Sequence, residues 1–234
     1  MITLHYETIN QAMREVLQKL MLLSSLSSFR LVGGTSLSLQ LGHRESVDID
    51  LFTDKTTDFN QISVDIQTHF NNIKLLSMGL NGQTWSIEGV KVDIYDWHVP
   101  FLQEPLIVDN IRMATIEEIA TYKFEALSNR RTEKDFIDIA EILKYFSFGT
   151  LLNSFRKRYP FIQTGAFLPL LLSPQLIERD DTLIMRNSES FEDAAQRICE
   201  AIAAYEKEEV DLTKKKMDAR NAYLAELLSR KKKK

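Results

Sequence analysis

The residues best suited to chemistry begin with two aspartates in the segment SVDIDLF, residues 46–52. Polar and apolar residues alternate there, which predicts a strand with Asp48 and Asp50 on one face. Two carboxylates so placed repel each other unless a cation lies between them. Because no histidine or cysteine cluster accompanies these oxygen ligands, the favoured ion is Mg²⁺ or Mn²⁺. The same alternation is also typical of the exposed face of an edge strand.

A third aspartate occurs in a second strand-like segment, VKVDIYD, at residues 90–96. Asp93 shares its face with Lys91 and Tyr95, opposite the apolar Val92 and Ile94. If this strand pairs near the first one, three carboxylates can hold two divalent ions, an arrangement used for in-line phosphoryl transfer. An exposed strand position is the alternative interpretation of Asp93.

A glycine pair precedes the aspartates in the run Gly33, Gly34, Thr35 and Ser36, where a predicted strand gives way to a short helix. Backbone N–H groups at a helix start favour an anion, and glycine lets phosphates approach closely. The hydroxyls of Thr35 and Ser36 could donate hydrogen bonds to such phosphates. The run is neither a Walker loop nor a dinucleotide fingerprint, and alone it is more typical of an ordinary turn.

The elements that position these residues divide the chain into two halves. For the first half we predict helices over 7–26, 35–41 and 59–70 and strands over 29–32, 46–52, 74–80, 84–89 and 90–97. For the second half we predict helices over 115–129, 132–145, 150–172 and from 190 onward, the first begun by a capping box of Thr115 and Glu118. The fold class is therefore α+β (α/β): a mixed sheet with helices over residues 1–105, then an all-helical domain with a helical tail over 106–234.

Composition narrows the function further. A net charge of −4 argues against a protein that coats nucleic acid, although short basic runs such as Arg130-Arg131 could bind it locally. The single cysteine, Cys199, leaves no partner for an intramolecular disulfide. No apolar run reaches the roughly 18 residues of a membrane helix, and no signal-peptide pattern is present, so we expect a cytoplasmic protein without membrane association.

The combination of these motifs is more specific than any one of them. The segment LVGGTSLSLQLGHRESVDIDLF, together with a later strand aspartate, resembles the nucleotidyltransferase superfamily of the DNA polymerase beta type. Within that superfamily it is similar to the AbiEii/AbiGii toxin family. IATYKFEALSNRRTEKDFIDIAEIL, residues 119–143, resembles the helical signature of the same family. The resemblance extends over about residues 10–150.

The resemblance implies a role for each motif. The glycine segment with Thr35 and Ser36 would hold the β and γ phosphates of a nucleotide, while Asp48 and Asp50 would ligate the metals. Asp93 would complete the second metal site or activate the attacking hydroxyl.

The helical signature adds three candidates. Lys123 would contact the triphosphate as a flexible point charge. Asp135 and Asp138, three residues apart, would share a helix face toward the cleft, Asp135 among the catalytic residues and Asp138 among those that bind the nucleotide. Many relatives carry a lysine where this chain has Val32, so Arg44 is a candidate for that phosphate contact. His43 is more typical of a helix end than of a general base.

The implied activity is the metal-dependent transfer of NMP from an NTP to an acceptor hydroxyl. The implied acceptor is RNA, with tRNA the favoured candidate, and the implied setting is a toxin opposed by a separate antitoxin. Two alternatives remain open: a non-catalytic partner- or RNA-binding protein on the same fold, and a metal-dependent nuclease that uses similar carboxylates.

Overall fold

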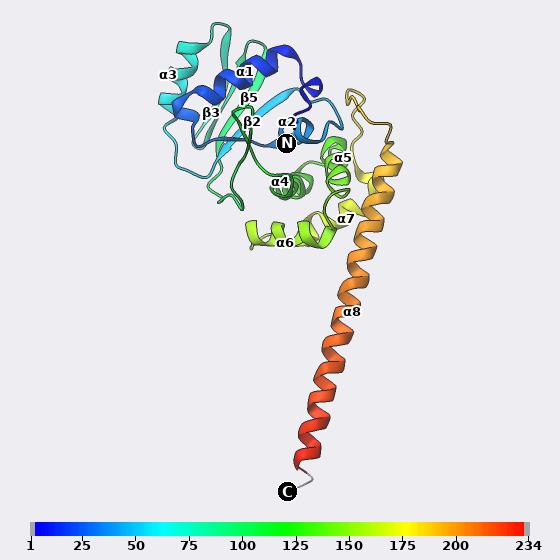
Figure 1. The fold of residues 1–234 in the computed structure, drawn as a ribbon. Coiled ribbons are helices and arrows are strands. Elements are labelled where there is room, and N and C mark those ends of the chain that lie inside the picture. Colours follow the sequence, from blue (N-terminus) through cyan, green and yellow to red (C-terminus); the bar gives the residue numbers. More distant parts are fainter. Residues whose placement is uncertain (1–2, 232–234) are drawn as a thin grey trace.

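A seven-stranded mixed sheet forms the centre of the computed structural model, which describes residues 3–231 and the side-chain burial as far as residue 221 (Figure 1). The strand order is β3-β4-β5-β2-β1-β7-β6. The strands are β1 (Arg30–Leu31), β2 (Asp48–Thr53), β3 (Ile73–Gly79), β4 (Gly82–Ile87), β5 (Val90–Asp96), β6 (Leu106–Val108) and β7 (Ile111–Met113).

The α-helices are α1 (Gln11–Leu22), α2 (Gly33–Leu41), α3 (Phe59–His69), α4 (Ile116–Asn129), α5 (Glu133–Ile142), α6 (Phe148–Arg158), α7 (Leu168–Leu171) and α8 (Phe191–Lys231). Short 3₁₀ turns flank α1 at Tyr6–Thr8 and Ser24–Leu26, so this helix is shorter than predicted. Asn10 fixes its start by accepting a hydrogen bond from the Met13 amide. The predicted mixed α/β class and the helical C-terminal region are confirmed, although residues 106–113, which the prediction assigned to the helical domain, add two strands to the sheet.

Strand β2 carries the alternation that the sequence predicts. Ile49 and Leu51 are buried in the core, while Asp48 and Asp50 are partly exposed on the other face. Strand β5 pairs with β2 in parallel and sets Asp93 directly across from Asp50. The two aspartate-bearing strands are therefore neighbours at the middle of the sheet.

The sheet continues into a segment for which no strand was predicted. Strands β6 and β7 form an antiparallel hairpin, and β7 pairs in parallel with β1. Asp109 and Asn110 form its two-residue turn, and both have positive φ, as type I′ turns require. With three residues each, these strands are too short for an alternation pattern to reveal.

Helix α4 begins as predicted, because Thr115 accepts a hydrogen bond from the Glu118 amide. The Glu118 side chain does not return to Thr115. It accepts hydrogen bonds from the Leu102 amide and from Arg158, at 2.7 and 2.6 Å. Half of the capping box thus forms, and the other half is replaced by a contact that ties α4 to α6.

Two hydrophobic clusters stabilise the chain. One lies between the sheet and helices α1 and α3, and the other joins α4, α5 and α6 with the first turns of α8. Beyond Tyr205, α8 leaves the body of the molecule, and residues 206–221 are exposed (Figure 1). None of the described helices is both long and apolar enough to span a bilayer.

Candidate active site

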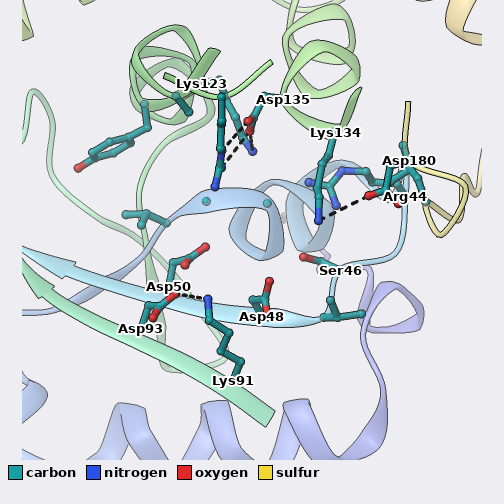
Figure 2. A pocket seen from close by; sticks show the side chains of 18 of the residues that line it. Arg44, Ser46, Asp48, Asp50, Lys91, Asp93, Lys123, Lys134, Asp135 and Asp180 are labelled. Carbon is teal, nitrogen blue, oxygen red and sulfur yellow. Dashed lines mark hydrogen bonds and ion pairs between the residues drawn. The ribbon is translucent and has the colours of Figure 1, made fainter. Parts of the chain in front are cut away.

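A cleft of about 580 Å³ lies between the aspartate-bearing face of the sheet and the helical half. Its walls come from β2, β5, the start of α2, α4, α5 and the segment 180–184 (Figure 2). Residues more than 100 positions apart in the chain therefore share one cavity.

The carboxylates of Asp48 and Asp50 project from β2 into this cleft (Figure 2). Within the part of the chain whose side chains are described, neither carboxylate accepts a hydrogen bond or forms an ion pair. Burial, and then the negative charges of Asp93 and Asp48, raise the pKa of Asp50 to about 6, while Lys123 acts in the opposite direction. Lys123 and Lys91 thus offset only part of the repulsion among these carboxylates.

Asp93 lines the same cleft but already has partners. Its carboxylate accepts hydrogen bonds from Thr84 Oγ1 and Lys91 Nζ, both at 2.6 Å. Among residues 3–231, no three acidic, histidine or cysteine side chains group closely enough to enclose an ion by themselves. The unpaired Asp48 and Asp50 nevertheless fit a divalent ion of the Mg²⁺ type, which takes one or two carboxylates and completes its shell with water and substrate phosphates.

The glycine pair lies against the charged groups of the cleft. A side chain at Gly33 would overlap the Asp50 carboxylate, and one at Gly34 would overlap the Arg44 guanidinium. Gly33 also has a φ of +67°, which disfavours other residues. These two positions need glycine because the backbone passes so close to both charges.

The hydroxyls of Thr35 and Ser36 are buried and do not line the cleft. Thr35 Oγ1 donates to the Asp48 carbonyl oxygen, and Ser36 Oγ accepts from Gln40 Nε2. Ser46, which is 2.8 Å from Thr35 Oγ1, lines the cleft in this region together with Arg44. Thr35 therefore braces α2 against β2, the Ser36 hydroxyl bonds within α2, and the cleft receives a serine, Ser46, that sequence reasoning missed.

Lys123 of α4 and Asp138 of α5 meet inside the helical half. Lys123 Nζ lies 2.5 Å from Asp138 Oδ2, and Arg44 contacts both oxygens of Asp138 at 2.7 Å. His43 Nε2 lies 2.8 Å from the same carboxylate. Burial favours the neutral acid, but the charges of Arg44 and Lys123 outweigh it and hold the pKa of Asp138 well below its ordinary value. Asp138 is fully buried behind the cleft wall, while Lys123 and Arg44 line it.

Asp135 faces the cleft one helical turn before Asp138. It accepts hydrogen bonds from Lys123, Arg130 and Thr132, at 3.0, 2.8 and 2.7 Å. Arg130 and Lys134 line the cleft as well. Spacing gave no signal for these two cations or for Arg44 as an ion-pair partner, since their place depends on how α5 packs against α2.

A family model described as the nucleotidyl transferase AbiEii toxin of type IV toxin–antitoxin systems matches residues 15–225. The chain belongs to the AbiEii nucleotidyltransferase toxin family. AbiEii membership confirms the resemblance predicted from the motifs and makes the chain a nucleotidyltransferase. It also implies a nucleotide substrate and a cognate antitoxin.

Individual proteins are similar to this AbiEii chain in sequence or in fold. An uncharacterized protein of Aquifex aeolicus (strain VF5) is 27% identical over 207 residues, which cover 87% of this chain and 93% of that one. The crystal structure of JHP933 from Helicobacter pylori is 19% identical with a TM-score of 0.53, and covers 87% of this chain and 94% of its own. MenT4, a nucleotidyltransferase toxin from Mycobacterium tuberculosis H37Rv, is 14% identical with a TM-score of 0.56 over 82% of each chain. At these identities the two structures show a shared fold.

Proposed function

We propose that the cleft binds an NTP with Mg²⁺ or Mn²⁺ and transfers its NMP to a hydroxyl of RNA, with tRNA the favoured acceptor. The observation that carries this proposal is the unpaired Asp48–Asp50 pair, which faces a wall of cations across one cavity. An acidic pair without a partner favours a divalent ion, and a cationic wall favours phosphates. The reaction would take place in the cytoplasm, opposed by the antitoxin.

The step exchanges a phosphoanhydride bond of the NTP for a phosphodiester bond to the acceptor. The acceptor oxygen forms a bond to the α-phosphorus, the bond from the α-phosphorus to the bridging oxygen of the β-phosphate breaks, and pyrophosphate leaves. Asp48 and Asp50 would hold the divalent ion, which would neutralise charge at the reacting phosphate. Asp93, beside Asp50, accepts the proton of the attacking hydroxyl or completes the metal site.

The cations have separable roles in this proposal. Lys123 and Arg44 neutralise the β and γ phosphates, next to the backbone N–H groups of Gly33 and Gly34. Asp135 and Asp138 are positioning residues: they hold the ammonium and guanidinium groups that touch the substrate. Asp138, which the motif alone assigned to nucleotide binding, acts through Arg44 and Lys123 because it is buried behind them.

The test is incubation of the purified full chain with Mg²⁺, each α-labelled NTP in turn and total tRNA. We expect one or more labels to enter RNA, and Asp48→Asn to reduce incorporation by about 10³-fold. Asp211→Asn, on the exposed part of α8, is the matched control and should keep full activity.

Other outcomes separate the alternatives. Shortened RNA without incorporation would replace transfer by a nuclease activity. No incorporation with any acceptor and no NTP binding would favour the non-catalytic interpretation.

A further inference from the structure

Four aromatic residues wall the end of the cleft beyond Asp50, and we call them the aromatic shelf: Phe52, Tyr95, Trp97 and Tyr122. Phe52 is at its centre, stacked on Trp97 with ring centroids 5.2 Å apart and an interplanar angle of 13°. Tyr122 and Tyr95 meet Phe52 edge-on, at 5.6 and 6.0 Å. Phe52, Tyr95 and Trp97 remain partly exposed to the cleft.

The shelf is held in place from behind. The Tyr95 ring lies so close to Gly82 of β4 that any side chain there would overlap it. The Tyr122 ring packs under the Arg158 guanidinium at 4.2 Å, and Trp97 Nε1 donates to the Tyr159 hydroxyl at 3.4 Å. A rigid, apolar and partly exposed surface inside a charged cleft is suited to a flat ligand, because its rings lose little freedom on binding.

The order of residues along β2 indicates which part of the substrate reaches the shelf. Asp48, Asp50 and Phe52 follow one another on one strand face, two positions apart. Arg44 and Ser46 lie before Asp48, beside Gly34, at the end of the cleft suited to phosphates. The shelf lies at the opposite end, past the aspartates.

In-line displacement requires the attacking oxygen and the leaving pyrophosphate on opposite sides of the α-phosphorus. With pyrophosphate at the Gly34–Arg44 end, the attacking hydroxyl enters from the side of Phe52 and Tyr95. The group that carries this hydroxyl therefore meets aromatic ring faces.

We infer that the aromatic shelf binds the base of the RNA nucleoside that carries the attacking hydroxyl. This assignment rests on the proposed nucleotidyl transfer and names the acceptor subsite of the same cleft. Stacking of a base on an aromatic side chain is tolerant of base identity, because every base has a flat π-face. The shelf thus selects a nucleoside terminus over an acceptor without a planar group, such as a serine side chain.

Binding is measured first without transfer, from the fluorescence of Trp97. The chain has two tryptophans, and Trp85 is buried on the sheet, outside the cleft. A short RNA with a terminal base should quench the fluorescence, whereas the same RNA with an abasic terminal residue should not. Tyr95→Leu, which keeps Trp97 as the reporter, should weaken the quenching, and Phe161→Leu, at an exposed aromatic outside the cleft, should leave it intact.

Transfer is measured next with the same variants, after thermal unfolding confirms that each is folded. Trp97→Leu and Tyr95→Leu should raise the KM for the RNA acceptor about tenfold and change the Kd for the Mg²⁺–NTP complex less than twofold. With the unsubstituted protein, the KM for the abasic RNA should exceed the KM for the intact RNA by a similar factor. With Trp97→Leu, the two RNAs should have the same KM.

Three results would separate a failure of the shelf assignment from a failure of the proposed transfer reaction. A rise in the NTP Kd with an unchanged acceptor KM would overturn the inference, since the shelf would then hold the NTP base. Equal quenching and equal transfer with abasic RNA would overturn it too. Base-dependent quenching without any transfer would support the shelf and refute the proposed reaction.

Discussion

Two pairs of aspartates lie on opposite walls of one cleft and differ in almost every physical respect. Asp48 and Asp50, on β2, have no partner among the described side chains, and the pKa of Asp50 is raised to about 6. Asp135 and Asp138, on α5, contact several cations, and the pKa of each is lowered. A carboxylate pair therefore indicates a cation site only where its charge is left uncompensated.

The two pairs are complementary. The α5 pair holds Lys123, Arg44 and Arg130 in place, and these cations face the cleft. The β2 pair leaves its negative charge free for a cation that comes with the substrate. A metal–triphosphate complex fits both walls, because its metal ion matches the β2 aspartates and its phosphates match the cations held by α5.

The largest expected effect on stability comes from removing a buried carboxylate whose two oxygens are both paired with cations. Asp138→Ala leaves Arg44 buried without its anion and takes one of two carboxylates from Lys123, so the free energy of unfolding should fall by about 3–5 kcal/mol in a urea titration. Asp48→Ala, which removes an unpartnered group, should change it by less than about 0.5 kcal/mol. An equal fall in the free energy of unfolding for both variants would show that the two aspartate pairs do not differ in this way.

The next largest effect is expected at Asp50, where substitution should raise the free energy of unfolding instead of lowering it. Its pKa of about 6 in the folded state lies above the ordinary value of 3.8, so the folded protein binds an extra proton between about pH 4 and 6. Ionisation of Asp50 therefore lowers stability above pH 6, and this cost disappears as the pH falls toward 4. In EDTA at pH 7.5, Asp50→Asn should be more stable than the unsubstituted chain by up to about 3 kcal/mol.

The pH series provides the control for that substitution. The stability difference between Asp50→Asn and the unsubstituted chain should vanish near pH 4. A difference that is independent of pH would show that lost packing, and not the charge, determines the effect.

The smallest effect concerns Lys91, whose ammonium lies 2.6 Å from Asp93 and faces the unpaired carboxylates (Figure 2). This half-exposed lysine supplies part of the charge that a divalent ion would supply. Lys91→Met should tighten Mn²⁺ binding by up to about fivefold, the range of an exposed ion pair. Weaker Mn²⁺ binding would instead make Lys91 a support for the position of Asp93.

Local patterns predicted the β2 wall better than the α5 wall. Alternation alone set Asp48 and Asp50 on one face, because strand geometry is a property of consecutive residues. The register that brings Asp93 to Asp50 depends on a parallel pairing between distant segments. The motif names Asp138 but does not reveal its burial, since that follows from the packing of α5 on α2.

Local patterns also fail to predict the positions of the Thr35 and Ser36 hydroxyls and of the aromatic shelf. Thr35 and Ser36 have the right type for a phosphate, yet α2 directs the Thr35 hydroxyl onto the Asp48 carbonyl of β2 and the Ser36 hydroxyl onto Gln40 of the same helix. The alternation that sets Asp93 and Tyr95 on one strand face extends to Trp97, but it does not show what that face meets. Only the sheet and the helical half together place Trp97 in the cleft.

The most direct test is Mn²⁺ binding to the full chain, followed by electron paramagnetic resonance in the presence of a non-hydrolysable NTP. Three proteins are compared: the unsubstituted chain, the double variant Asp48→Asn/Asp50→Asn, and Asp135→Asn, each verified as folded by thermal unfolding. We expect the double variant to lose at least about tenfold in Mn²⁺ affinity and Asp135→Asn to stay within about threefold of the unsubstituted chain. Unchanged Mn²⁺ affinity in the double variant would contradict the assignment of the unpaired β2 aspartates as the cation site.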